Sequence, residues 1–316
     1  MSFQTSHQVR VVHVEQVTPL IKHFILEAAD GTELPRFSGG SHVVVVMRDG
    51  AHTHRNPYSL MGDGYHTRQY QIGVRREDAS RGGSAFMHDK VRPGDTLELL
   101  APANLFALER FARRHLLIAG GIGITPFRSM LHDLRRRAAD YELHYCVSGT
   151  EHAAFWDTIA HECGARALLH AGGQRMDIVA LLREQPAGTH VYVCGPTRLI
   201  EAVKGAAAAS GWSQASVHYE EFSHAATGAA FDVTLARSGR LIHVSEEQTL
   251  LEALEDAGLE PPSMCRGGVC GACETAVVEG TVEHRDHVLA PGQKAAMRTM
   301  IVCVSRAACQ GLVIDL

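Results

Sequence analysis

The sequence predicts a multidomain protein with an antiparallel β-barrel, an α/β domain built on a parallel sheet, and a small α+β domain. Three observations predict this order. Short apolar runs fill residues 9–105, strand and helix patterns alternate from Arg114 onward, and four cysteines gather near the C-terminus. A chain of 316 residues with 45% hydrophobic residues can supply several cores, because domains usually contain about 100–200 residues.

The first region, residues 1–107, is expected to form the barrel. Its apolar runs are short and are separated by turns, which is typical of antiparallel all-β folds. We predict strands at Val9–Val14, Phe24–Glu27, His42–Met47, Tyr70–Val74 and Thr96–Leu100.

The second region, residues 108–222, is expected to form a parallel sheet covered by helices, because strand and helix patterns alternate along it. In the first helix Phe127, Met130, Leu131 and Leu134 form one apolar face. The predicted elements are Leu116–Ala119, Phe127–Arg137, Glu142–Val147, Phe155–Glu162, Ala167–His170, Ile178–Glu184, Val191–Cys194, Leu199–Ala209 and Ser216–Phe222.

Residues 223–230 are small and mostly uncharged, and they are expected to link the second region to the last domain, residues 231–316. In that domain we predict strands at Phe231–Leu235 and Leu241–Val244, then a helix over Thr249–Gly258. The cysteine loop follows the helix.

The cysteines Cys265-x4-Cys270-x2-Cys273, with Cys303 as the fourth, have the spacing of a plant-type [2Fe–2S] ferredoxin. Glycines at 267, 268 and 271 are expected to let the loop wrap the cluster. A zinc site is the alternative, but four-cysteine zinc sites normally supply a second close pair, and here the fourth cysteine is single. Three of the four other cysteines, Cys146, Cys163 and Cys309, are expected to be buried small hydrophobes.

Composition excludes several classes of function. The formal net charge of −5 gives no electrostatic footprint for nucleic acid, and the run Arg135-Arg136-Arg137 is expected to close a helix and face water. The N-terminus has no charged leader before an apolar run, and no stretch approaches the ~20 apolar residues of a membrane span. We therefore expect a cytoplasmic protein without a membrane partner.

Two segments of the barrel carry groups that suit a flavin. Arg55, Tyr58, Ser59 and Leu60 offer an arginine, a phenol and a hydroxyl, although such residues are also common on ordinary half-buried strands. The second segment, Arg81-Gly82-Gly83-Ser84, precedes an expected helix start, where backbone amides can hold a phosphate.

Two glycine-containing turns of the second region suit a dinucleotide. The first is Gly120-Gly121-Ile122-Gly123-Ile124-Thr125-Pro126, which joins a strand to the amphipathic helix. Pro126 suits the first turn of that helix. Glycine turns in this position are also common as plain tight turns. The second turn, Cys194-Gly195-Pro196, ends a later strand of the same sheet.

Together these motifs resemble the phthalate dioxygenase reductase family, the FMN-binding branch of the ferredoxin-reductase superfamily, over essentially the whole chain. The resemblance implies a β-grasp ferredoxin domain with Cys265, Cys270, Cys273 and Cys303 as ligands of the cluster. Two residues, Asn56 and Pro57, separate Arg55 from Tyr58, whereas the common motif has one. The FMN contacts implied are Arg55, Tyr58, Ser59, Leu60, Gly73, Val74, Arg75, Arg81, Gly82, Gly83, Ser84, Thr125 and Phe222. The NAD contacts implied are Gly120, Gly121, Gly123, Pro126, Ser148, Cys194, Gly195 and Pro196.

The combination implies an electron-transfer reductase. NADH gives up two electrons at once, a [2Fe–2S] cluster accepts one, and a flavin can stand between them; no acid–base residue is required. We expect NADH rather than NADPH, because residues 146–151 carry no Arg or Lys for a 2′-phosphate. Arg175, in a nearby loop, keeps NADPH open.

The family resemblance implies that the partner is a Rieske non-haem iron oxygenase acting on an aromatic or quaternary-amine substrate. A cytochrome P450 or another oxygenase is the alternative acceptor, and a redox-sensing iron–sulfur binding module is a third hypothesis. We expect the free protein to be a monomer. The face around Arg266 and the cluster loop is expected to meet the acceptor.

Overall fold

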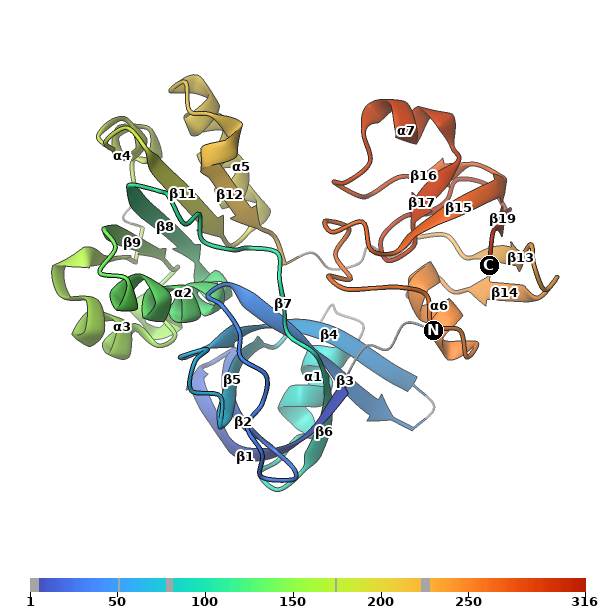
Figure 1. The fold of residues 1–316 in the computed structure, drawn as a ribbon, viewed down its shortest axis with the longest axis horizontal. Helices are drawn as coiled ribbons and strands as arrows, with labels where there is room; N and C mark the ends of the chain where they lie inside the picture. The colour runs from blue at the N-terminus through green and yellow to red at the C-terminus, as the bar shows by residue number, and fades with distance from the viewer. Residues whose placement is uncertain (1–5, 51, 78–81, 174, 223–227) are drawn as a thin grey trace. The chain divides into compact units, whose positions relative to one another are not determined.

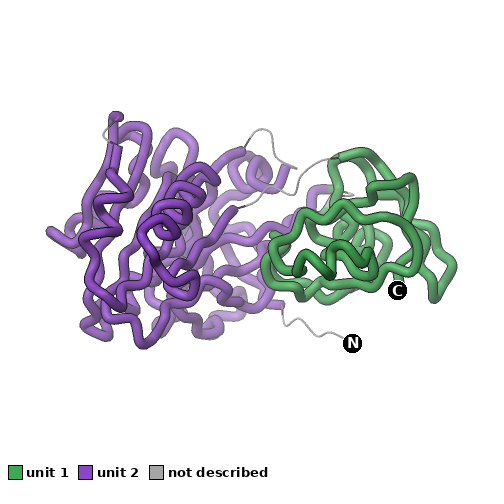
Figure 2. Tube along the Cα trace, turned by 90° about the horizontal axis from the view of Figure 1, so that it is seen from above, with its two compact units in different colours: residues 1–4, 50–53, 223–316 green, residues 5–49, 54–222 purple. Residues whose placement is uncertain are grey.

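The structure is a computed structural model that describes residues 6–50, 52–77, 82–173, 175–222 and 228–316. The chain divides into two compact units, shown in different colours in Figure 2. The N-terminal unit contains residues 6–49 and 54–222 of this set. The C-terminal unit contains residues 228–316 together with 50, 52 and 53.

The first part of the N-terminal unit is an antiparallel barrel, as predicted (Figure 1). The strands follow the order β4-β5-β2-β1-β6-β3-β7, and a further pairing between β4 and β3 closes the sheet. Alternate side chains point inward and form the core, for example Phe24 and Leu26 of β2, which are fully buried. The strands are β1 (Ser6–Thr18), β2 (Ile21–Ala28), β3 (Ser41–Asp49), β4 (His52–Met61), β5 (Gln69–Arg75), β6 (Thr96–Leu100) and β7 (Ala103–Asn104).

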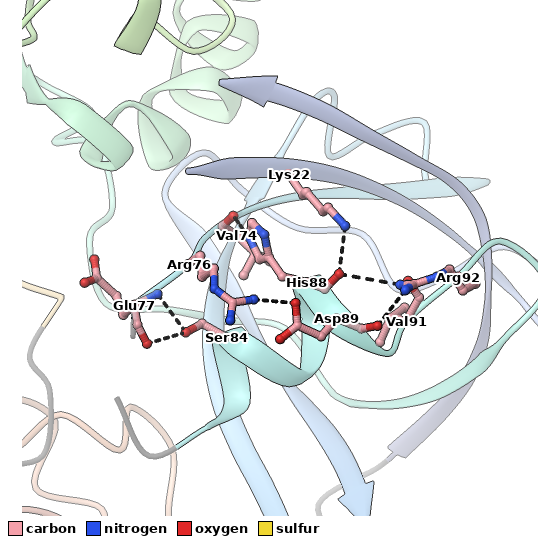
Figure 3. Close-up of polar contacts among 9 residues, drawn as sticks. All are labelled: Lys22, Val74, Arg76, Glu77, Ser84, His88, Asp89, Val91 and Arg92. Atoms are coloured by element: carbon pink, nitrogen blue, oxygen red, sulfur yellow. Dashed lines mark hydrogen bonds and ion pairs between the residues drawn. The ribbon is translucent and has the colours of Figure 1, made fainter. Parts of the chain in front are cut away.

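Helix α1 (Gly83–Asp89) packs on the barrel and is tied to it by polar contacts (Figure 3). His88 Nε2 donates a hydrogen bond to the carbonyl oxygen of Val74 at 2.9 Å. Lys22 Nζ donates to the carbonyl oxygen of His88 at 2.7 Å. Met87 reaches the barrel core and is fully buried. The short helix is therefore fixed against β2 and β5.

The second part of the N-terminal unit is a fully parallel sheet with strand order β10-β9-β8-β11-β12 and helices on both faces, again as predicted. Helices α2 and α3 cover one apolar core, and α4 and α5 cover the other. The elements are β8 (Arg114–Gly120), α2 (Thr125–Arg136), β9 (Tyr141–Cys146), α3 (Trp156–Cys163), β10 (Ala167–His170), α4 (Ile178–Arg183), β11 (Thr189–Cys194), α5 (Thr197–Ala209) and β12 (Val217–Glu220).

Helix α2 joins the parallel-sheet part to the barrel. Asp133 Oδ2 accepts a hydrogen bond from the Gly39 amide at 2.8 Å, and Ser129 Oγ accepts one from the Gly40 amide at 3.1 Å. The Arg136 guanidinium lies 3.8 Å from the centre of the Tyr65 ring and pairs with a barrel aspartate. Arg136 therefore contacts the barrel, which corrects the expectation that the arginine run only faces water.

The C-terminal unit is a mixed five-stranded sheet, order β14-β13-β19-β15-β17, packed on helix α6. The predicted strands 231–235 and 241–244 form as a hairpin. Thr249 begins the helix: its Oγ1 accepts from the Glu252 amide, while the Glu252 carboxylate accepts from the Thr249 amide. The elements are β13 (Phe231–Leu235), β14 (Leu241–Val244), α6 (Leu250–Asp256), β15 (Glu274–Glu279), β16 (Val282–Glu283), α7 (Pro291–Ala296), β17 (Thr299–Ile301), β18 (Arg306–Ala307) and β19 (Gly311–Ile314).

A buried arginine, Arg306, ties this unit together. Only 2% of its surface is exposed, and its ring partner is Phe231 at 5.0 Å. The guanidinium donates hydrogen bonds to four backbone carbonyl oxygens, at distances of 2.7–3.3 Å, which belong to Gly228, Ala229, Ser245 and Gln248. Arg306 thus joins the start of the domain to the entrance of α6.

Within the described residues, no helix is long and apolar enough to cross a membrane.

We expect Arg306→Met to lower the free energy of unfolding of the C-terminal unit by about 3 kcal/mol, because four buried carbonyls lose their donor. The readout is loss of the visible absorbance of the cluster during urea unfolding. Arg237→Met is the matched control, since Arg237 pairs with Asp315 at the surface. Equal midpoints for the two variants would contradict this role of Arg306.

Candidate functional site

The four predicted cluster ligands converge in the C-terminal unit. Cys265, Cys273 and Cys303 are buried and Cys270 is partly exposed. Hydrogen bonds from the Cys270 and Cys303 thiols lower the pKa of Cys265, and one from Cys303 lowers the pKa of Cys273. Within the described residues, no three His, Cys, Asp or Glu side chains are arranged to hold a single metal ion.

The cysteine loop also turns backbone amides toward these sulfurs. The Gly267 amide donates to Cys265 Sγ at 3.4 Å, and the amides of Val269 and Ala272 reach Cys265 and Cys270. Amide donors stabilise thiolate charge, as an iron–sulfur cluster requires. The residues present therefore fit a [2Fe–2S] cluster held by four cysteines.

The loop obtains its curvature partly from an unexpected residue. Gly268 and Gly271 have φ values of 75° and 74°, as the sequence suggested, but Gly267 does not have a positive φ; Arg266 does, at 52°. The Arg266 guanidinium makes two hydrogen bonds of 2.7 Å to the Glu255 carboxylate of α6. Its side chain is 6% exposed. Arg266 is a buried brace of the loop, so it does not present its charge to an acceptor.

The other cysteines only partly match the expectation of buried hydrophobes. Cys163 is buried, Cys146 is intermediate, and Cys309 is exposed. Cys309 Sγ lies between β18 and β19, where it accepts a hydrogen bond from the Thr281 amide at 3.3 Å. Cys309 therefore stabilises the turn before β19 through a hydrogen bond and is not part of an apolar core.

In the barrel, the fold brings the two predicted flavin segments together. A Cβ placed on Gly83 would lie 2.7 Å from the amide atoms of Asn56, and one on Gly82 would lie 3.2 Å from the His54 ring. Gly82 also has a φ of 96°. The strand segment 54–60 and the start of α1 thus form one continuous surface, and Arg81 lies outside the described residues.

On β4, alternate residues face opposite sides of the sheet. Leu60 is fully buried in the barrel core, and the half-buried ring of Tyr58 packs at the edge of that core. Burial raises the pKa of Tyr58 far above its usual value. The hydroxyl of Ser59 points to the other face: it is buried and has no hydrogen-bond partner in the described part of the chain.

An unpaired buried hydroxyl is costly unless a ligand completes it. Ser59 precedes Leu60, whose partner on β5 is Ile72, the residue before Gly73. The residues present at this face fit a flavin ring.

The remaining predicted flavin contacts lie around this surface. Val74 is buried, and Arg75 pairs with Glu77 at 2.9 Å. Ser84 Oγ accepts a hydrogen bond from the Glu77 amide at 3.1 Å (Figure 3). Phe222 follows β12 and is 39% exposed, so its place over a ring stays a prediction.

The two predicted nucleotide turns meet at the middle of the parallel sheet. Strands β8 and β11 are neighbours there, although β9 and β10 lie between them in sequence. This reversal of strand order is where α/β sheets bind ligands. A Cβ on Gly195 would lie 2.9 Å from the Gly120 Cα atom, and one on Gly123 would lie 2.2 Å from the Cys194 carbonyl oxygen. These glycines permit backbone contact between the turns.

Gly121 differs from the other glycines of its turn. Its φ is 55°, and a Cβ there would meet open space, so it borders the site from the solvent side. Pro126 begins α2. Thr125 is 2% exposed, and its hydroxyl donates to the Ile122 carbonyl at 3.0 Å. Its methyl group points at Gly73: a Cβ on that glycine would lie 2.9 Å from Thr125 Cγ2.

Ser148 follows the end of β9, where Cys146 pairs with Gly120 of the first turn. Its carbonyl oxygen accepts a hydrogen bond from the Gly172 amide at 3.3 Å, which joins the loops that follow β9 and β10. Glu151, three residues after Ser148, has its carboxylate close to Gly149. A Cβ on Gly149 would lie 2.4 Å from Glu151 Oε1. The carboxylate of Glu151 therefore folds back over the end of the second strand.

Sequence reasoning missed Glu220, which ends β12 directly opposite Cys194. Its Oε2 atom has no exposed surface and no hydrogen-bond partner among the described residues. Burial raises the pKa of Glu220 to about 8, and burial together with Glu220 raises the pKa of Cys194. A neutral carboxyl therefore borders the second nucleotide turn at pH 7. The parallel order of β11 and β12 is the signal that could have located it.

Comparisons with known proteins follow the same division. A model of the 2Fe-2S iron-sulfur cluster binding domain matches residues 233–312. A model of the N-terminal domain of dimethylamine monooxygenase subunit DmmA-like proteins matches residues 103–217.

Whole-length relatives are also similar. The chain is 45% identical to the heme-dependent oxidative N-demethylase beta subunit of Ectopseudomonas mendocina (strain ymp), with 98% of each chain covered. It is 44% identical to the carnitine monooxygenase reductase subunit of Escherichia coli (strain K12), with both chains fully covered. A solved structure described as phthalate dioxygenase reductase, a modular structure for electron transfer from pyridine nucleotides to [2Fe-2S], aligns with TM-score 0.87, 34% identity and 98% of each chain.

Glu220 predicts a pH dependence of stability in the parallel-sheet part. The usual pKa of a glutamate carboxyl is 4.5, and that of Glu220 in the folded chain is about 8. Between these two pH values the unfolded chain has lost the carboxyl proton of Glu220, while the folded chain keeps it. The free energy of unfolding therefore falls as pH rises, by up to about 1.4 kcal/mol per pH unit from this group. Glu220→Gln is expected to remove this fall.

The measurement is urea unfolding at pH 5, 6 and 7, followed by the fluorescence of Trp156 and Trp212, which both lie in the parallel-sheet part. Glu221→Gln, the neighbouring change, is the control. If the stability of Glu220→Gln followed the same pH slope as the parent protein, the buried neutral carboxyl would be disproved.

Proposed function

The chain belongs to the phthalate dioxygenase reductase family, and from that membership we propose that it is the NADH-dependent reductase component of an oxygenase system. Electrons pass from NADH through FMN to the [2Fe–2S] cluster and then to the oxygenase. The observation that carries the proposal is one chain with four converging cysteines, a barrel face with an unpaired hydroxyl, and two nucleotide turns in backbone contact.

FMN, when bound, supplies the conversion of a hydride from NADH into single electrons. The chain's own residues hold and shield these groups. We propose that Ser59 and the backbone near Gly73 bind the flavin ring. Gly82, Gly83 and Ser84 bind the phosphate of FMN, and Thr125 and the Cys194–Pro196 turn bind the nicotinamide.

We propose domain boundaries at 1–107, 108–222 and 231–316, with 223–230 as the linker.

We also propose NADH rather than NADPH as the donor. Support comes from Glu151, whose carboxylate lies over Gly149 at the end of the second strand. A carboxylate there can accept hydrogen bonds from ribose hydroxyls and repels a 2′-phosphate. Arg175 is exposed in the loop after β10 and is the residue that would favour NADPH.

The acceptor is proposed to be a Rieske-type non-haem iron oxygenase, with a haem-containing oxygenase as the second candidate. The E. mendocina relative, whose name is heme-dependent, favours the second. Names that refer to an N-demethylase and to carnitine favour an amine substrate over an aromatic one.

We also propose a location and an oligomeric state. None of the eight cysteines forms a disulfide, which suits a reducing compartment. We propose a cytoplasmic protein that is a monomer when it is not bound to its acceptor.

The first test is an anaerobic titration of the purified protein with NADH, in parallel with Cys270→Ser. The parent protein is expected to show bleaching of both flavin and cluster absorbance. The variant is expected to keep flavin reduction and to lose reduction of the one-electron acceptor cytochrome c by about tenfold or more, because only the cluster path is removed.

Cys309→Ser is the matched control, since Cys309 lies outside the ligand set. A parent protein that contains zinc and no iron or sulfide would disprove the cluster. A parent protein that does not oxidise NADH would disprove the reductase and favour a redox-sensing module.

The coenzyme preference is tested with Glu151→Lys. The ratio of kcat/KM for NADH to that for NADPH is expected to fall by about 10–100-fold, because a repelling charge becomes an attracting one. Glu201→Lys makes the same charge change on α5, where Glu201 pairs with Lys204, and serves as the control. An unchanged ratio in Glu151→Lys, together with a changed one in Arg175→Ala, would assign the preference to Arg175.

A further inference from the structure

Phe155 has a backbone conformation that phenylalanine rarely adopts. Its φ of 61° and ψ of 10° lie in the left-handed region, directly before the first residue of α3. Bulky residues are genuine outliers there, and they persist only where surrounding contacts hold them. The contacts of the ring show what holds this conformation.

The Phe155 ring packs beside the apolar core of the parallel-sheet part and also reaches the barrel. It meets the His23 ring of β2 edge-on, with centroids 5.4 Å apart and an interplanar angle of 83°. A Cβ on Gly73 of β5 would lie 3.5 Å from Phe155 Cε2. His23 and Gly73 are direct partners in the β2–β5 ladder. Burial lowers the pKa of His23, which keeps this ring neutral. The contact thus spans two neighbouring strands of the barrel (Figure 1).

Three side chains of the parallel-sheet part converge on Gly73. Thr125 Cγ2, Phe155 Cε2 and Ile122 Cδ1 would lie 2.9, 3.5 and 3.6 Å from a Cβ at that position. Thr125 and Ile122 come from the turn after β8, and Phe155 comes from the segment after β9. Gly73 does not have a positive φ, so what this position requires is space. Gly73 forms a socket for two separate loops.

The socket lies between the two halves of the reaction site. On one side, Ser59 carries the unpaired hydroxyl and precedes Leu60, which pairs with Ile72, the residue before Gly73. On the other side, Thr125 begins α2 beside the turns that meet at Gly120 and Gly195. Any shift of the Phe155 ring therefore changes the spacing between the flavin face and the nucleotide turns.

We propose that Phe155 is a positioning residue for hydride transfer, acting through Gly73 and His23 to fix the nucleotide turns at the distance that the flavin face requires. This inference rests on the proposed function. Phe155 does not contact the reacting groups itself. Its strained backbone is retained because the ring is needed at the socket, and a misplacement of about 1 Å between reactants can cost 10²-fold in rate.

Phe155→Asn separates this role from a merely structural one. Asparagine accepts the left-handed conformation but has no ring. Relief of the backbone strain offsets part of the packing that is lost with the ring, so the variant is expected to fold, while its rate of flavin reduction by NADH in anaerobic stopped-flow falls by about 10–100-fold. Phe155→Tyr retains the ring and is expected to reduce its flavin at nearly the parent rate.

Phe111→Asn is the matched control, because Phe111 is 89% exposed in the same unit. A Phe155→Asn protein that reduces its flavin at the parent rate would overturn the proposal, and so would one whose rate falls only in proportion to lost folded protein. If the parent protein itself did not reduce flavin with NADH, the proposed function would fail instead, and the two failures are thereby distinct.

A second pair of variants tests the socket from the other side. Gly73→Ala introduces a methyl group that overlaps Thr125 Cγ2 and is expected to slow flavin reduction by about tenfold or more. Thr125→Ser removes that methyl group, so adding it to Gly73→Ala is expected to restore part of the rate. An unchanged rate in Gly73→Ala would exclude the socket as the element that sets the spacing.

Discussion

Backbone segments of this chain approach one another more closely than a Cβ atom would allow, and the functional surfaces depend on those approaches. The turns after β8 and β11 touch at Gly120 and Gly195, the barrel touches the parallel-sheet part at Gly73, and Gly40 lies against the Phe106 carbonyl. A side chain at any of these positions would overlap backbone or a packed methyl group. The contacts therefore specify position in a way that adaptable side-chain packing does not.

The cluster loop meets a related demand by a different route. Four sulfurs must gather in a small space, and their charge must be balanced without solvent. Amides of the loop supply part of that balance, and Glu255 holds Arg266 in the left-handed conformation that turns the loop. The ion pair is buried inside the unit, so it fixes the shape of the loop and adds no charge to the exposed surface of the loop. Apolar side chains such as Met264 and Val269 are what the loop exposes.

Local patterns predicted what depends on local physics. The barrel, the parallel sheet, the strands 231–235 and 241–244, and the ligand spacing follow from periodicity and from the geometry of short loops. The missed features depend on partners in other parts of the chain. Arg136 meets Tyr65 of the barrel, Phe155 meets His23, and Arg266 of the cluster loop meets Glu255 of the preceding helix. Glu220 required knowing which strand lies beside it, and the exposure of Cys309 required the turn before β19.

The position of Arg306 has a consequence for how the holoprotein is made. Cys265, Cys270 and Cys273 lie in one loop, but Cys303 is only three residues before the arginine that gathers carbonyls from residues 228, 229, 245 and 248. Arg306 therefore ties the segment of the fourth thiol to the first strand and to the entrance of α6. Assembly of the ligand set is thereby coupled to the folding of the whole unit.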